Sequence, residues 1–332
     1  MTFKYNNVYI NEVSTITGPK EGEGPLSKFF DKSYSEYYMG SDTWEQAEVK
    51  MNTENIDLLL NKSNKSKKDV DIFISGDLLN QIVASSYAAS TLNIPYMGIY
   101  SACATSTEGI IIASNMIEGG LINNSVVNVS SHNNASEKQF RYPVEYGGPK
   151  PVTQTFTVTG SASALISNKK SNIKVESATL GKCIDSGVKN VFDMGSVMAI
   201  AAADTIDKHL KDTKREIGYY DLILTGDLGM YGKNLLKDVL KDEYGYDTKN
   251  VNDSACMIYD INKQSVYAGG SGPACIALVT YSYILNLMRQ GKLNRVLMVA
   301  TGALMNPTMV NQKLSIPSIA HAVSLEVISW CI

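Results

Sequence analysis

The sequence predicts an α/β fold built from two similar halves, with mixed sheets covered by helices. The chain has 332 residues, 44% of them hydrophobic, and roughly 250 residues is where one core usually divides. Apolar strand segments alternate with helical segments, which favours mostly parallel sheets covered on both faces. A strand motif of the first half also returns in the second half. We therefore expect halves at 1–167 and 168–332.

The first elements along the chain are a strand near Val8–Val13 and a helix that opens at Ser41 and Asp42. Glu45 stands where it would close a capping box for that helix. The helical spacing then turns three side chains toward the core, those of Trp44, Ala47 and Met51.

The repeated motif is Asp71-Ile-Phe-Ile-Ser-Gly-Asp-Leu78, an apolar strand that ends in a Gly-Asp turn. A turn at Gly98–Ser101, a helix over about Cys103–Gly119 and the strand Val126–Ser131 follow it. The strand Ala162–Ile166 is expected to close the first half, before the polar link at 167–172.

The second half opens with the strand Ile173–Leu180. It repeats the motif as Asp221-Leu-Ile-Leu-Thr-Gly-Asp-Leu228. The turn Gly269–Gly272, a helix over about Pro273–Gln290 and the strand Val296–Thr301 come in the same order. An internal duplication explains this most simply. The alternative is that two βαβ units look alike because glycine turns and valine strands are common solutions.

Composition excludes several classes of partner. The formal net charge of -3 gives no long-range field toward nucleic acid or an anionic membrane, and no apolar run reaches the ~20 residues that span a bilayer. The start at Met1 lacks the features of a secretory signal, so we expect a cytosolic chain. Five irregularly spaced cysteines and three histidines predict neither a disulfide framework nor a metal site. No cofactor is expected, since Gly269–Gly272 lacks the remaining features of a P-loop or dinucleotide fingerprint.

Cys103 is the candidate reactive residue because it stands where a strand gives way to a helix. Unpaired backbone N–H groups and the helix dipole meet at such a point, favouring a thiolate and attracting anions. The alternative is a small apolar residue buried in a tight turn.

The context Gly98-Ile-Tyr-Ser-Ala-Cys-Ala-Thr-Ser-Thr-Glu-Gly109 resembles the nucleophile turn of the thiolase superfamily of condensing enzymes, and Thr159–Ala164 resembles its strand entry. The resemblance covers essentially the whole chain and implies a thiolase-like fold of α-β-α-β-α layers, in which a homodimer is plausible. Its enzymes pair the cysteine with two further groups, a histidine and an asparagine or second histidine. The matching turns here carry Asp227 and Ser271 instead, which we keep as candidate ligand contacts.

A closer resemblance is to the stage V sporulation protein AD family. It rests on five segments, which are Thr43–Glu48, Ser131–Asn133, Gln139–Gly147, Gly302–Leu304 and Ile316–Glu326. The resemblance implies a protein that binds dipicolinic acid, as free acid or calcium chelate, without catalysis. It also implies integral membrane subunits of a spore channel complex as partners, and a peripheral place on the cytoplasmic face of the spore inner membrane.

Dipicolinate is a planar dianion, so its site should offer hydrogen-bond donors, one or two cations and an apolar wall. We expect Ser101, Thr105 and the backbone amides of the Cys103 helix to bind one carboxylate, Arg141 to bind the other, and Tyr142 to cover the ring, with Cys103 itself kept as a ligand contact. Arg141 and Tyr142 equally fit simple packing of their loop against the other half or a dimer mate.

Two histidines are further candidates. His321 precedes the last apolar strand and is the best candidate to face Cys103, while His132 ends a strand at a carboxyl edge, where a loop histidine bonded to Asn133 or Asn134 is the plainer interpretation. His209 is expected on an exposed helical face. Two other functions stay open: a condensing enzyme or acyl transferase with Cys103 as nucleophile and His321 as base, and a purely structural subunit.

Overall fold

The computed structural model describes residues 1–140 and 150–328. The first half forms a sheet of order β5-β4-β6-β8-β2, in which β8 runs antiparallel to both of its neighbours and the other pairs are parallel. Its strands are β2 (Tyr9–Thr17), β4 (Ile72–Gly76), β5 (Tyr96–Gly98), β6 (Asn124–Ser131) and β8 (Gly160–Ser167). A short strand, β3 (Lys32–Ser33), pairs with β2.

The second half repeats this topology with the order β11-β10-β13-β14-β9, and here β14 is the antiparallel strand. Its strands are β9 (Ile173–Leu180), β10 (Leu222–Thr225), β11 (Val251–Asp253), β13 (Arg295–Ala303) and β14 (Ser318–Val327). In both sheets the order along the chain is third, second, fourth, fifth, first. The sheets join where β2 pairs briefly with β9, and β1 (Thr2–Lys4) extends β9. The boundary predicted after residue 167 falls at the end of β8.

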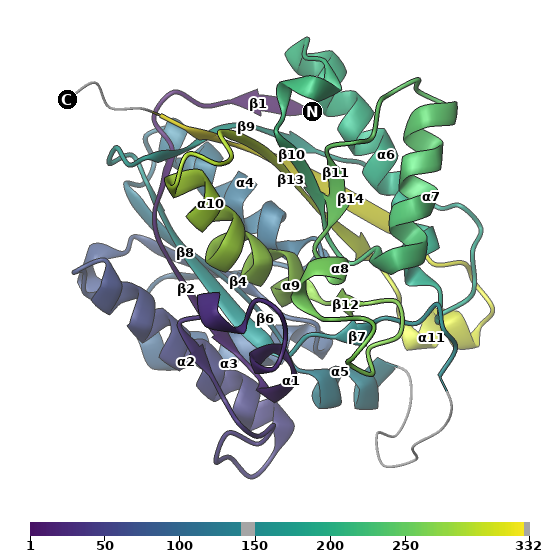
Figure 1. Cartoon of the computed structure of the whole chain (residues 1–332). Helices are drawn as coiled ribbons and strands as arrows, with labels where there is room; N and C mark the ends of the chain where they lie inside the picture. Colours follow the sequence, from purple (N-terminus) through teal and green to yellow (C-terminus); the bar gives the residue numbers. More distant parts are fainter. Residues whose placement is uncertain (141–149, 329–332) are drawn as a thin grey trace.

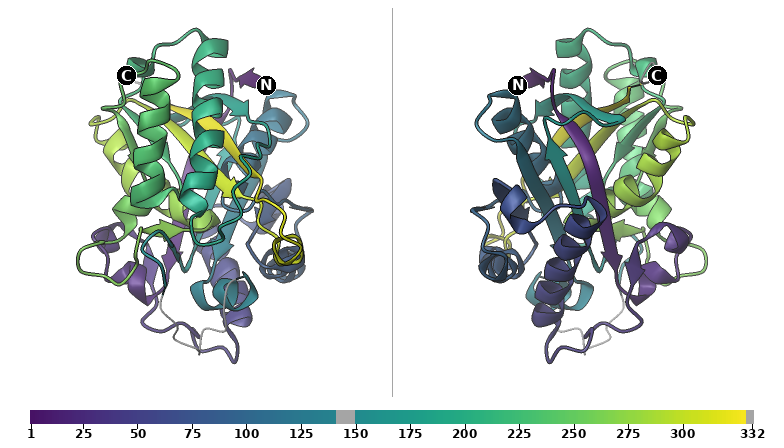
Figure 2. Two further views of the ribbon diagram at one scale, coloured as in Figure 1. Left: turned by 90° about the vertical axis from the view of Figure 1, so that its right-hand side faces the viewer. Right: turned by 90° about the vertical axis from the view of Figure 1, so that its left-hand side faces the viewer.

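The helices form three layers around the two sheets (Figure 1). The central layer holds α4 (Thr105–Glu118) and a second helix built from α9 (Pro273–Leu278), a π-helical turn (Val279–Ile284) and α10 (Leu285–Arg289). The outer layers hold α2 (Trp44–Lys62) and α3 (Val83–Leu92) on the first sheet, and α6 (Met194–Thr213) and α7 (Gly229–Asp242) on the second. Both side views agree with this arrangement (Figure 2). The predicted layered α/β fold is confirmed.

The central helices explain why the halves do not form separate cores. Helix α4 packs against strands of both sheets, and the largest apolar cluster combines its Ile110 and Ile111 with Ile276 and Leu278 of α9. Burial of this kind stabilises by about 25 cal/mol for each Å² of apolar surface removed from water. Each half therefore supplies one face of a shared interior. The site between the halves is built on this packed core.

Helix α2 begins later than the sequence predicted. Its N-cap is Thr43, whose side chain accepts the Gln46 N–H, so the cap expected from Ser41, Asp42 and Glu45 is wrong in register. Threonine and aspartate are both good caps, and the segment offers several of them. Ala47 and Met51 are fully buried as predicted, while Trp44 is half-buried.

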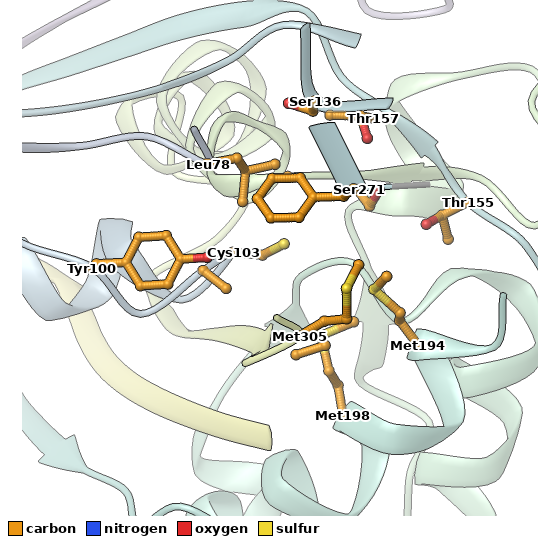
Figure 3. Close-up of a pocket in the computed structure, with 14 residues that line it drawn as sticks. Leu78, Tyr100, Cys103, Ser136, Thr155, Thr157, Met194, Met198, Ser271 and Met305 are labelled. Carbon is orange, nitrogen blue, oxygen red and sulfur yellow. The ribbon is translucent and has the colours of Figure 1, made fainter. Parts of the chain in front are cut away.

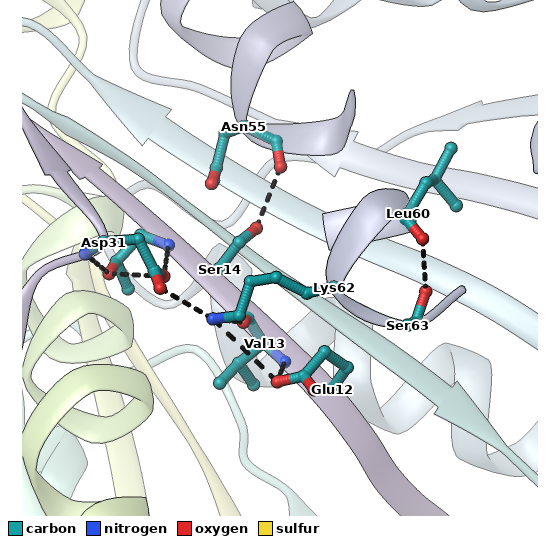
Figure 4. A network of polar contacts seen from close by, with 9 residues as sticks. Glu12, Val13, Ser14, Asp31, Asn55, Leu60, Lys62 and Ser63 are labelled. Atoms are coloured by element: carbon teal, nitrogen blue, oxygen red, sulfur yellow. Dashed lines mark hydrogen bonds and ion pairs between the residues drawn. The ribbon is translucent and has the colours of Figure 1, made fainter. Parts of the chain in front are cut away.

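The end of α2 is tied to the first sheet by Lys62 (Figure 4). Its Nζ donates to the Val13 carbonyl oxygen and to Asp31 Oδ1, both at 2.7 Å, and lies 3.9 Å from Glu12 Oε1. A lysine in the last turn also complements the negative end of the helix dipole. Because these groups are partly exposed, the pairs add little free energy but fix the orientation of α2 on β2.

Short elements complete the described chain. A two-stranded sheet of β7 (Phe156–Thr157) and β12 (Gly270–Ser271) links the two halves beside the central helices. The remaining helices are α1 (Pro19–Gly22), α5 (Asn133–Phe140), α8 (Ala255–Ile258) and α11 (Pro307–Asn311), with 3-10 turns at Ser27–Phe29, Lys67–Asp69, Asn80–Ile82 and Ile217–Tyr219. Across residues 1–140 and 150–328, no helix has the length and apolar character to cross a bilayer.

Candidate functional site

Cys103 lies in a tight turn between β5 and the start of α4. Ala102 adopts a left-handed backbone conformation with φ of 49°, which is uncommon for a residue other than glycine. Thr105 closes the turn, because its hydroxyl donates to the Ala102 carbonyl oxygen at 2.6 Å and accepts the Ser101 N–H at 3.0 Å. The sulfur is thereby held next to the N-terminus of α4, as the sequence predicted.

The second half supports this turn directly through Gly302 of β13. A Cβ atom at Gly302 would lie 2.2 Å from the Ser101 carbonyl oxygen and 3.2 Å from the Ala104 nitrogen. The backbones therefore touch, and only glycine fits between them. The position of Cys103 is set by both halves of the chain.

A pocket opens beside Cys103 (Figure 3). One part of its wall is apolar and carries the side chains of Leu78, Tyr100, Phe140, Met194, Met198, Ala303 and Met305. Another part carries hydroxyl groups, those of Ser136, Thr155, Thr157 and Ser271. The Ser136 hydroxyl is buried and has no hydrogen-bond partner among the described residues. The cavity thus pairs a surface suited to a ring with donors suited to a polar edge.

Asp227 is the buried acid behind Cys103. It lies in the turn after β10 with φ of 69°, and Asp253 holds that turn by accepting the Thr225 hydroxyl at 2.7 Å and the Gly229 N–H at 3.1 Å. Oδ2 of Asp227 accepts the Gly272 N–H at 3.2 Å, its Oδ1 has no hydrogen-bond partner among the described residues, and the thiols of Cys103 and Cys275 lie close enough to lower its pKa. One carboxyl therefore connects the cysteine turn with the turn before α9.

Burial raises the pKa of Asp227 well above its usual range, and the nearby Asp253 carboxyl raises it further, although the two thiols and the Gly272 N–H oppose the shift. The side chain is fully buried, which disfavours its charged form. Burial therefore favours the neutral acid more than it does for an exposed aspartate, and the neutral acid cannot take a thiol proton. An ionised Asp227 would instead oppose formation of a neighbouring thiolate.

The turn before α9 supplies a hydroxyl and backbone groups. Ser271 lines the cavity, its carbonyl oxygen accepts the Val158 N–H at 2.8 Å, and the following Gly272 has φ of 103°. No histidine or asparagine lies among the described residues that line the cavity. The geometry brings together the predicted residues Cys103, Asp227 and Ser271.

The two candidate histidines lie elsewhere, and His132 Nδ1 is buried without a hydrogen-bond partner among the described residues. His321 is buried in β14, where its Nδ1 accepts the Gly181 N–H at 3.1 Å, and His132 Nε2 lies 2.8 Å from the Tyr37 carbonyl oxygen. Burial lowers the pKa of each imidazole to about 4. Both rings are therefore neutral near pH 7, and neither lines the cavity.

His209 was expected on an exposed face, and the structure overturns this. It is fully buried, with Nδ1 at 2.7 Å from Thr179 Oγ1 and Nε2 at 2.6 Å from the Tyr220 hydroxyl. The charged neighbours in sequence were misleading, because helical spacing places His209 on the face of the buried Ala202 and Ile206.

Four other predicted residues are not placed in the cavity wall by the structure. Thr105 is fully buried and its hydroxyl donates inside the turn. Ser101 is also buried, and neither residue lines the cavity. Arg141 and Tyr142 lie outside the described residues.

The sequence reasoning missed the hydroxyl wall and the methionines. Met194 and Met198 are four residues apart on α6 and so share one helical face, a spacing that could have been noticed. Thr155 and Thr157 alternate along an extended segment, as side chains on one face of a strand do. Ser136 gives no such signal, because it reaches the cavity only through the placement of α5.

The repeated topology, the paired central helices and a cysteine at the entrance of one of them define a thiolase-like protein. Solved condensing enzymes share this fold. 3-oxoacyl-[acyl-carrier-protein] synthase III from Aquifex aeolicus aligns with a TM-score of 0.60 and 13% identity over 96% of this chain and 99% of that one. Cerulenin-bound OleA from Xanthomonas campestris aligns with a TM-score of 0.60 and 16% identity over 97% of this chain and 100% of that one.

The sequence comparison is more specific. A family model described as stage V sporulation protein AD matches residues 1–326. The stage V sporulation protein AD of Bacillus subtilis (strain 168) is 48% identical over 319 residues, which cover 96% of this chain and 94% of that protein. The chain belongs to the stage V sporulation protein AD family and is a sporulation protein, and the resemblance drawn from its motifs is confirmed.

Proposed function

We propose that the chain binds dipicolinic acid without catalysis, in the cavity beside Cys103, for uptake into the developing spore. The observation that carries the proposal is the acid at Asp227, which stands where the family resemblance places the imidazole of a condensing enzyme and which lies beside the Cys103 thiol. The nucleophile turn remains, while the groups that would activate it are replaced.

The energetic reason for proposing no catalysis is the loss of two groups together. A general base contributes about 10²–10⁴-fold to a rate, and one oxyanion donor contributes about 10²–10³-fold. Asp227 is favoured as the neutral acid, and Ser271 with Gly272 occupies the second position. The cavity can persist without the rate enhancement that such groups supply.

The two-sided cavity supports a planar aromatic acid as the ligand. Tyr100, Met198 and Met305 offer rings and thioethers that pack against a ring face, since sulfur and aromatic groups both favour such contacts. Ser136 and Ser271 offer hydroxyl donors to a carboxylate. The start of α4 adds the positive end of a helix dipole next to Cys103.

The proposed site must balance the negative charge of the ligand. None of the described residues that line the cavity carries a positive charge, while the ligand is a dianion. Arg141 remains the proposed cation for the second carboxylate, and calcium chelation is the other route to neutrality. The neutral state of Asp227 fits both, because an ionised acid beside the ligand would repel it.

The cellular part of the proposal rests on family membership. We propose a peripheral place on the cytoplasmic face of the spore inner membrane, with integral membrane subunits of a channel complex as partners. A homodimer is also proposed, since edge strand β5 presents partly exposed Met97 and Tyr100 beside its free edge in the described chain. The nearly balanced charge supports neither nucleic acid nor a polyanion as partner.

Two measurements on the wild-type protein test this function. Titration calorimetry with dipicolinate and with its calcium chelate, to millimolar concentration, should give saturable heat. Intact-mass spectrometry after incubation with acyl-CoA should show no thioester, with iodoacetamide labelling of Cys103 as the control for access to the sulfur. Absence of heat with either ligand form contradicts the binding function and favours a structural subunit. An acyl group on Cys103 favours the condensing enzyme or acyl transferase.

A further inference from the structure

Glu21 is a buried acid that the proposed function does not use. It lies in the short helix α1 and is fully buried. Its Oε1 accepts the Thr159 N–H at 3.0 Å and the Tyr259 hydroxyl, while its Oε2 has no hydrogen-bond partner among the described residues. A carboxyl buried with one oxygen unpaired is costly to ionise.

The contacts of Glu21 lead to the hydroxyl wall of the cavity. Thr159 is the second residue after β7, and its hydroxyl accepts the Asn133 N–H of α5 at 2.9 Å. Thr157 of β7 and Ser271 of β12 are register partners and both line the cavity. The turn that carries Thr159 is thus held between Glu21 and α5, and any movement of it moves the wall.

The surroundings of Glu21 provide little to balance a negative charge. The titratable or charged groups that face it or its partner Tyr259 are Lys20, Glu23, Tyr37, Tyr259 and Cys275. Of these, Lys20 is cationic, and its effect on the Glu21 carboxyl is the smallest of those that act on it. The nearby His132 is neutral, because burial lowers its pKa to about 4.

We propose that Glu21 is a positioning residue for the β7–β12 wall and that its ionisation makes binding of an anionic ligand at the cavity depend on pH. The protonated acid accepts the Thr159 N–H and keeps the wall closed. The ionised acid accepts the Thr159 N–H more strongly and places a negative charge behind the wall, which opposes an anionic ligand. This inference rests on the binding function proposed above.

The Glu21 carboxyl ionises near neutral pH. Burial raises the pKa of Glu21 to about 7, against the opposing hydrogen bonds from Tyr259 and Thr159. The acid is therefore mostly neutral below pH 7 and mostly charged above it. Because the folded state holds this proton more tightly than the unfolded chain, stability falls as pH rises from the ordinary glutamate range to about 7. Affinity for an anion falls from about pH 7 upward.

Calorimetric titration of the full chain with dipicolinate between pH 6 and 8.5 tests the inference, since the ligand keeps its charge across that range. If only the protonated form binds, wild-type affinity is about 30-fold weaker at pH 8.5 than at pH 6. Glu21→Gln keeps an acceptor for Thr159 without a charge, so its profile should be flat.

Tyr259→Phe provides a second measurement. Its result would not change if Glu21 had only a structural role. Loss of its hydrogen bond raises the pKa of Glu21 further, so the midpoint of the wild-type profile should move to higher pH. The same fall in Glu21→Gln as in wild type, a flat wild-type profile, or an unmoved midpoint in Tyr259→Phe overturns the inference. Absence of binding at every pH instead contradicts the binding function itself.

Discussion

Ala303→Trp is expected to weaken dipicolinate binding by about 100-fold or more, which corresponds to about 2.8 kcal/mol. Ala303 ends β13 with 6% of its surface exposed, and it lines the cavity beside Met305. An indole at this position fills space that the ligand needs, and close-packed neighbours have little room to yield. Titration calorimetry at pH 6 measures the loss.

The matched control is Ala303→Ser, which keeps a small side chain at the same position and should bind within a few-fold of wild type. Thermal melting of both variants shows whether the fold survives. A folded Ala303→Trp protein that binds with wild-type affinity would contradict the Cys103 cavity as the site and place the ligand elsewhere.

Gly302→Ala is expected to lower the free energy of unfolding by about 3 kcal/mol, at the upper end of the usual cost of overpacking a core. The added Cβ would stand 2.2 Å from the Ser101 carbonyl oxygen, and backbone atoms move less easily than side chains. Relief requires the Cys103 turn and β13 to separate, so ligand binding should fall together with stability. Urea unfolding measures the first effect and calorimetry the second.

Gly218→Ala is the control for the glycine exchange. Gly218 lies in a 3-10 turn, where an added Cβ meets no atom within 4 Å, and its unfolding free energy should stay within about 0.5 kcal/mol of wild type. Equal stability of Gly302→Ala and wild type would mean that the two halves do not meet tightly at the cysteine turn.

Much of the fold could be predicted because local sequence patterns specify its strands and helices. The strand predicted at Ile173–Leu180 has those bounds in the structure, and the helix predicted near Cys103 begins at Thr105. Apolar alternation and glycine turns specify such elements with little help from distant contacts. Register at the start of α2 was wrong because several residues there compete as caps, and the choice depends on packing against the first sheet.

The site was predictable in part, for a different reason. Cys103, Asp227 and Ser271 occupy turns of recognisable sequence, and the topology brings those turns to one place. Ser136 comes from α5 and joins them through tertiary placement, which no local pattern records. The acid Glu21 is more distant still, because its importance depends on burial and on its hydrogen bond to Thr159.

The proposed function gives Asp227 a specific part, because the family resemblance places an imidazole at its position in condensing enzymes. Activation of a thiol requires a base that accepts its proton and then carries a positive charge beside the thiolate. A neutral buried carboxyl provides neither, but Asp227 accepts the Gly272 N–H and lies beside the thiols of Cys103 and Cys275. In the proposed function the cavity is kept while the thiol is not activated.

A crystal structure of the protein soaked with dipicolinate is the most direct measurement. Density for the planar ligand is expected next to Cys103, with its ring against the methionines and Tyr100, a carboxylate at Ser136 and Ser271, and the sulfur unmodified. Density confined to another surface, or a covalent bond from the ligand to Cys103 Sγ, would contradict a non-catalytic binding site between the two halves.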